Sequence, residues 1–100
     1  ANNETGAVMD VAAIGARCRA VGAVFHCDGT QWVGKMPTDV SPAGPQGGTI
    51  DLLSFSPHKW HGPKGVGVLW ARAGVGLATQ LAGTQEHGRR GGTENVPAIV

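Results

Sequence analysis

The chain has 100 residues, of which 41% are hydrophobic and 15% are charged, and its formal net charge is +1. Hydrophobic content at this level is typical of a globular protein, and no apolar run reaches the roughly 20 residues that a membrane span needs. A net charge near zero argues against nucleic-acid or membrane binding as the main task, because both usually need concentrated basic charge.

The composition and the two ends of the sequence indicate a segment of a longer protein. The chain begins inside "ANNETG" and ends at "NVPAIV", which reads as the opening of a helix. Three tryptophans and two phenylalanines are few for a self-sufficient core. No internal repeat or domain boundary is visible, so we expect residues 1–100 to be part of one larger domain.

The first predicted element is a helix that begins after Asp10 and ends at Gly22. Aspartate is a good N-cap, and glycine is a common residue at the point where a helix stops. The apolar residues between them recur at helical spacing and form one stripe: Val11, Ile14, Cys18 and Val21. We therefore expect Cys18 to lie in the core.

Three short runs of β-type composition follow, at residues 23–28, 50–56 and 66–70. A helix followed by a buried strand is half of a βαβ unit, which predicts an α/β fold. Only nine residues, 57–65, separate the second run from the third. A parallel crossover needs a dozen or more, so these two strands should be antiparallel neighbours or lie in different layers. After Arg72 the chain is polar and glycine-rich, which predicts irregular structure until about Glu94.

Polar residues follow the first two predicted strands directly. Ligands of open α/β sheets bind beyond the carboxyl ends of parallel strands, and both Asp28 and Ser56 fall at such ends. The stretches "DGTQ" and "SPHK" would then face one crevice.

These residue types suit an aldehyde cofactor that carries a phosphate. Lys59 can form a Schiff base with the aldehyde. Ser56 and His58 can bind phosphate through a hydroxyl and an imidazole N–H. Asp28 can pair with a protonated pyridine nitrogen, which keeps the ring an electron sink.

Four blocks, in order, resemble one family: "ANNETG", "HCDGTQWVGKMP", "DLLSFSPHKWHGPKGVGVLW" and "QEHGRRGGTENV". They are similar to the cysteine desulfurases of the nitrogen-fixation and iron–sulfur-assembly type, within the class-V aminotransferase group of pyridoxal-phosphate enzymes. The resemblance covers nearly all 100 residues. It implies a piece of the large, pyridoxal-phosphate-binding domain of fold-type-I enzymes: a mostly parallel sheet with one antiparallel strand and helices on both faces.

The resemblance also implies a role for individual residues at the cofactor ring. Lys59 is the lysine that forms the Schiff base, and Asp28 is the partner of the pyridine nitrogen. Gln31 is a hydrogen-bond donor to the phenolic oxygen of pyridoxal phosphate. Asn3 lies close to the ring and the substrate.

The phosphate ligands implied by the resemblance come from two subunits. Ser56 and His58 bind the phosphate of their own chain's cofactor. Thr93, in the "GGT" block, reaches the cofactor phosphate of the neighbouring subunit. The resemblance therefore implies a homodimer with shared sites.

The implied reaction converts L-cysteine to L-alanine and leaves the sulfur on an enzyme cysteine as a persulfide. An iron–sulfur scaffold or another sulfur-acceptor protein then takes the sulfur. In this family the persulfide cysteine lies downstream of Val100 and the histidine that stacks on the ring lies upstream of Ala1. We therefore expect neither Cys18 nor Cys27 to carry the persulfide. The two cysteines lack a CxxC spacing, which favours a reducing, cytoplasmic location.

The chain departs from the usual family pattern at three positions. Cys27 stands where valine is usual, Gly29 where alanine is usual, and His87 where arginine is frequent. The loop of residues 41–48 is also several residues longer than in some relatives. None of these departures falls on a predicted cofactor ligand.

The histidines of the sequence do not indicate a metal site. His58 and His61 lack a second ligand pair at a suitable spacing, so we expect no metal site. His26 lies on the same strand face as Asp28, and we expect it to be a buried histidine with satisfied hydrogen bonds.

Alternative functions remain open at this point. A selenocysteine lyase or a class-V aminotransferase would share every block, and the residues after Val100 would decide between them. In another class, the "HGRRGG" region would suit a non-catalytic phosphate or nucleic-acid binding module, although a single copy without aromatic residues is a weak signal.

Overall fold

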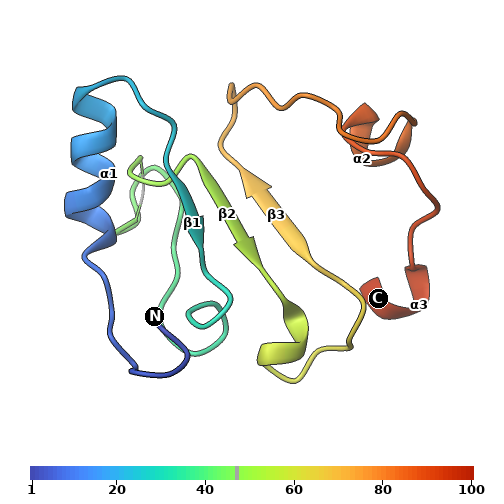
Figure 1. Cartoon of the computed structure of the whole chain (residues 1–100), viewed down its shortest axis with the longest axis horizontal. Helices are drawn as coiled ribbons and strands as arrows, with labels where there is room; N and C mark the ends of the chain where they lie inside the picture. The colour runs from blue at the N-terminus through green and yellow to red at the C-terminus, as the bar shows by residue number, and fades with distance from the viewer. Residues whose placement is uncertain (47) are drawn as a thin grey trace.

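The computed structural model describes residues 1–46 and 48–100. Figure 1 shows the order of the elements along the chain. They are α1 (Val11–Ala20), β1 (His26–Asp28), β2 (Leu52–Phe55), the 3₁₀ turn η1 (Pro57–Lys59), β3 (Val68–Ala71), α2 (Gln85–Gly88) and α3 (Val96–Ile99). Gly47, in the loop expected to be longer than in relatives, lies outside the described residues.

The three strands form one sheet in the order β1-β2-β3. β1 and β2 run parallel, with Cys27 opposite Leu53, and β2 and β3 run antiparallel, with Leu53 opposite Trp70. The predicted α/β class and the antiparallel placement of the last strand are confirmed. The strands are shorter than the sequence runs, because the ladder between β1 and β2 holds only three residue pairs and that between β2 and β3 only four.

Helix α1 begins and ends as the sequence predicts. The Asp10 carboxylate accepts a hydrogen bond from the backbone N–H of Ala13 at 2.9 Å, which caps the first turn. Gly22 has φ +70°, a conformation that glycine adopts without strain, and its N–H donates to the Arg19 carbonyl. The expected stripe is only partly buried. Val21 is 76% exposed, because it is the C-cap residue and lies beyond the last helical turn.

A small core joins α1 to the sheet. Among the described residues, its buried hydrophobic side chains are these: Val11, Trp32, Ile50 and Leu53. Cys27 is half-buried against this cluster, as expected for the face of β1 opposite Asp28. Gly15 lets α1 pack closely against the segment that precedes β2, because a Cβ atom on residue 15 would stand 2.5 Å from the Thr49 carbonyl oxygen.

An ion pair ties the three strands together at one end of the sheet. The Asp51 carboxylate accepts from the Phe25 N–H at 2.8 Å and from Arg72 Nε at 2.8 Å, and a second guanidinium nitrogen of Arg72 also contacts it. These residues precede β1, precede β2 and follow β3. The Phe25 N–H, then the Arg72 guanidinium, hold the pKa of Asp51 below its usual value.

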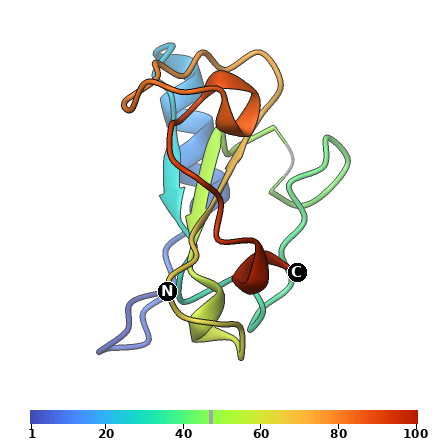
Figure 2. The ribbon, with the colours of Figure 1, turned by 90° about the vertical axis from the view of Figure 1, so that its right-hand side faces the viewer.

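Residues 72–100 lie beyond β3, on the side of the sheet away from α1 (Figures 1 and 2). The expected irregular structure is interrupted by α2, a single turn in which Glu86 and His87 have φ of 50° and 58°. The last helical turn, α3, begins at Val96, close to the predicted position. No helix in residues 1–46 and 48–100 has the length and apolar character to cross a membrane.

Candidate active site

A pocket of about 370 Å³ opens where β1 ends and the turn after β2 begins. The residues that line it come from the N-terminal loop, the end of β1 and η1: Ala1, Asn2, Asn3, Asp28, Thr30, Gln31 and Lys59. β1 and β2 are parallel, so their carboxyl ends lie at one edge of the sheet. The structure thus brings together four residues predicted from the sequence: Asn3, Asp28, Gln31 and Lys59.

Asp28 is the last residue of β1, and the turn that follows holds its carboxylate. Asp28 Oδ1 accepts a hydrogen bond from the Thr30 N–H at 2.9 Å. The Thr30 hydroxyl and N–H lower the pKa of Asp28, and the nearby His26 adds to this effect. Asp28 is therefore ionised near neutral pH and can pair with a cationic N–H.

Gln31 is half-buried at the pocket, in tight turns that begin immediately after β1. The Trp32 and Val33 N–H groups donate to the Gly29 carbonyl, and the Lys35 and Met36 N–H groups donate to the Trp32 carbonyl. This winding places Lys35 Nζ 2.5 Å from Gln31 Oε1. Lys35 was not among the residues predicted from the sequence, although its spacing of four residues from Gln31, as on adjacent turns of a helix, was an available signal.

Lys59 reaches the pocket from η1, which follows β2. Pro57 at the first position fixes φ in a helical range and starts the turn, and the Lys59 N–H donates to the Ser56 carbonyl at 3.1 Å. The N–H groups of Trp60 and Gly62 both donate to the Pro57 carbonyl. These bonds fix the backbone on both sides of Lys59, while its side chain is exposed.

The three predicted phosphate ligands are not among the residues that line this pocket. Ser56 caps η1 with an extended backbone, but its hydroxyl makes no capping hydrogen bond in the described structure. His58 lies within η1 and is exposed. Thr93 is exposed in the segment between α2 and α3, beyond β3.

His26 corrects one expectation from the sequence. The residue is exposed rather than buried, and its Nε2 lies 2.9 Å from Ser54 Oγ on the neighbouring strand. The reason is that His26 and Asp28 share the sheet face opposite Cys27, and the described core packs on the Cys27 face.

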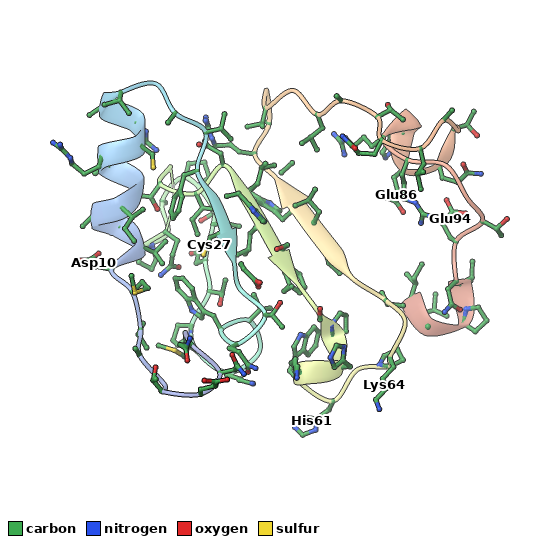
Figure 3. The ribbon with its side chains drawn as sticks, in the orientation of Figure 1. Asp10, Cys27, His61, Lys64, Glu86 and Glu94 are labelled. Atoms are coloured by element: carbon green, nitrogen blue, oxygen red, sulfur yellow. The ribbon has the colours of Figure 1, made fainter. Side chains whose placement is uncertain are left out.

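The cysteines do not lie in the pocket. Cys18 and Cys27 are both half-buried free thiols, and Figure 3 shows Cys27 on β1. Burial raises the pKa of the Cys27 thiol. Within the described ranges, no group of three or more His, Cys, Asp or Glu residues is arranged to hold a metal ion.

The sequence and the fold match known proteins along the whole chain. Residues 1–100 match the family model of class-V aminotransferases. The chain is 50% identical over 101 residues to a cysteine desulfurase of Nostoc sp., covering 100% of this chain and 24% of that protein. It is 48% identical over 101 residues to a cysteine desulfurase of Cereibacter sphaeroides, again covering 100% of this chain and 25% of that protein.

Solved structures give the same result. A NifS-like protein from Rickettsia africae superposes with a TM-score of 0.87 at 34% identity, over 99% of this chain and 26% of that chain. The structure described as SspA in complex with cysteine superposes with a TM-score of 0.85 at 39% identity, over 98% of this chain and 28% of that chain. The chain thus spans about a quarter of the relatives that it matches. The similarity indicated by the four sequence blocks is confirmed, and the chain belongs to the class-V aminotransferase family.

Proposed function

We propose that this chain is part of a pyridoxal-phosphate-dependent cysteine desulfurase. The whole enzyme converts L-cysteine to L-alanine and passes the sulfur to one of its own cysteines as a persulfide. The observation that carries the proposal is the convergence of Asn3, Asp28, Gln31 and Lys59 on one pocket at the carboxyl ends of two parallel strands.

The polar groups of the pocket fit pyridoxal phosphate. Asp28 is ionised, and its carboxylate, whose Oδ1 accepts the Thr30 N–H, has further acceptor capacity for a pyridinium N–H. Gln31 has its oxygen bound by Lys35, so its two N–H groups are the donors available for a phenolic oxygen. Lys59 supplies the amine. A carboxylate, an amide donor and an amine match the ring nitrogen, the phenolic oxygen and the aldehyde of this cofactor.

When bound, pyridoxal phosphate supplies an electron sink for negative charge that develops on the substrate carbon. With the cofactor bound, Asp28 would keep a proton on the ring nitrogen, and the Gln31 N–H groups would orient the ring by donating to the phenolic oxygen. Lys59 Nζ would hold the cofactor and move the substrate proton. Asn3 borders the space where a small amino acid would lie.

Further parts of the proposal concern the whole protein. Ser56 and His58 bind the cofactor phosphate, and Thr93 binds that of the neighbouring subunit in a cytoplasmic homodimer. Ser56 and His58 lie at η1, which also carries Lys59, whereas Thr93 is exposed in the segment between α2 and α3, beyond β3, and this difference in position supports a role for Thr93 in trans. An iron–sulfur scaffold or another acceptor protein takes the sulfur, as expected for an enzyme of iron–sulfur assembly or nitrogen fixation.

The similarity to several proteins described as cysteine desulfurases favours cysteine as the substrate. The full-length protein should bind pyridoxal phosphate with a visible absorbance band and release alanine and sulfide from L-cysteine with a thiol reductant. Reduction with borohydride, followed by peptide mass spectrometry, should place the cofactor on Lys59. Lys59→Ala should lower kcat by at least about 10³-fold.

Each alternative predicts a different outcome. A selenocysteine lyase would act on L-selenocysteine with a much higher kcat/KM than on L-cysteine. An aminotransferase would produce a keto acid instead of alanine and sulfide. Wild-type turnover by the Lys59→Ala variant would contradict the assignment of the lysine.

A further inference from the structure

Gln31 and Lys35 form a pair in which one residue lines the pocket and the other does not. Gln31 is half-buried and borders the pocket, whereas Lys35 is exposed and lies outside the group of residues that line it. The ammonium Nζ of Lys35 donates to Gln31 Oε1 at 2.5 Å. Lys35 therefore acts on the pocket only through another side chain.

This contact fixes the orientation of the Gln31 amide. A primary amide can present either its oxygen or its NH₂ group to a ligand, and the two ends have nearly the same shape. A lysine ammonium has only donors, so it binds the amide oxygen and excludes the flipped orientation. With Oε1 bound, the hydrogen-bonding capacity that Gln31 offers a ligand is its pair of N–H donors.

The segment that carries the pair is fixed on both sides of Lys35. Trp32 is only 7% exposed, and its indole N–H donates to the Pro37 carbonyl at 3.0 Å. The Lys35 N–H donates to the Trp32 carbonyl at 3.0 Å. The backbone on which Lys35 stands is thus anchored to a buried residue, which keeps the ammonium within reach of Gln31.

We propose that Lys35 is a positioning residue of the cofactor site, which holds Gln31 as a hydrogen-bond donor toward an acceptor oxygen of the ligand. The identity of that oxygen, the phenolic oxygen of pyridoxal phosphate, rests on the proposed function. Lys35 is not among the residues that line the pocket, so its role is to position Gln31 rather than to bind the ligand. Its effect is to order the Gln31 side chain before the ligand binds, so that binding does not have to order it.

The test uses the full-length protein with its cofactor removed. Lys35→Met keeps most of the side-chain stem and removes the ammonium. Ordering one flexible side chain on binding weakens affinity by about three- to tenfold, and we expect this loss in a titration with pyridoxal phosphate. Lys35→Arg keeps donors at this position and should restore most of the affinity. The matched control is Lys64→Met, at the exposed lysine of the loop between η1 and β3 (Figure 3), which should bind as the unsubstituted protein does.

A double-mutant cycle separates action through Gln31 from a direct effect of the lysine charge. In a Gln31→Ala background, Lys35→Met should cause no further loss of affinity, because the side chain it orders is gone. The pH at which the visible band of the bound cofactor titrates should shift in Lys35→Met and in Gln31→Ala in the same direction.

Different results would overturn the positioning role of Lys35 and the proposed function. Additive losses in the cycle, or a Lys35→Met variant with unchanged affinity and unchanged titration, would overturn the positioning role while leaving the proposed function intact. An unsubstituted protein that binds no pyridoxal phosphate would overturn the proposed function, and this inference with it.

Discussion

Gly34 lies against the indole of Trp60, so close that a Cβ atom on Gly34 would stand 2.6 Å from Trp60 Cγ. Gly34 lies within the turns that carry Gln31, which continue to Met36, and Trp60 follows Lys59 directly in the sequence. The contact therefore joins the two loops that supply the pocket. Only glycine is suited to this position, because its φ of +78° is also one that other residues rarely adopt.

Replacing Gly34 by alanine should disturb the pocket through this contact. The added methyl group collides with Trp60 and strains the backbone, and we expect a loss of about 1–3 kcal/mol in stability. Displacement of Trp60 also moves Lys59, so kcat of the full-length enzyme should fall. Gly76→Ala is the control, because a Cβ atom there meets no atom within 4 Å and its φ is not positive. Equal thermal unfolding and activity in the two variants would contradict this account.

The Asp51 and Arg72 pair should make stability depend on pH. The pKa of Asp51 is lower in the folded chain than its ordinary value of 3.8. Its contribution to stability is therefore fully present above the unfolded pKa and is lost as the pH falls through the folded pKa. Asp51→Asn should lower Tm by about 2–4 °C at neutral pH, with a smaller difference from wild type at pH near 3. A constant difference across this range would show that the carboxylate charge is unimportant.

The strength of this ion pair follows from its exposure. The Arg72 side chain is 49% exposed, so solvent screens the pair, and we expect a coupling energy near 1 kcal/mol in a double-mutant cycle with Arg72→Met. The Phe25 N–H still binds Asp51 in the Arg72→Met variant. Asp51→Asn should therefore be more destabilising than Arg72→Met.

Local signals in the sequence predicted the elements that depend on local physics. Asp10 and Gly22 marked the two ends of the first helix in the sequence. They could do so because capping and left-handed φ are properties of single residues and their near neighbours. The short connection of residues 57–65 was enough to exclude a parallel crossover. The convergence of Asp28 and Lys59 followed from the rule that parallel strands end at the same edge of a sheet.

Features that depend on contacts between distant residues could not be predicted in this way. Asp51 and Arg72 lie 21 positions apart in the sequence, and no periodicity connects them. The exposure of His26 depends on which face of β1 the core covers. The left-handed residues Glu86 and His87 are not glycines, and their residue types do not by themselves predict positive φ.

Neither cysteine of this chain should carry the persulfide. Burial raises the pKa of Cys27, so its thiol is protonated near neutral pH and a poor nucleophile. Cys18 is half-buried on α1, and both residues lie outside the group that lines the pocket. After turnover of L-cysteine by the full-length protein, alkylation and peptide mass spectrometry should find the persulfide on another cysteine. A labelled persulfide on Cys18 or Cys27 would refute this prediction.

Mixed dimers test whether Thr93 serves the cofactor of the opposite subunit. A dimer of one Lys59→Ala chain and one Thr93→Ala chain then collects both defects in one site and leaves the other intact. Such dimers should recover activity that neither mutant homodimer shows, whereas a Thr93 that serves its own chain leaves one defect in each site. A hydrogen bond to a charged phosphate contributes about 1.5–3 kcal/mol, so the assay needs limiting pyridoxal phosphate, where losing that bond lowers occupancy about tenfold or more. Coexpressed chains that are no more active than the better homodimer would place Thr93 at its own chain's site or at none, because a shared site must restore one complete set of residues.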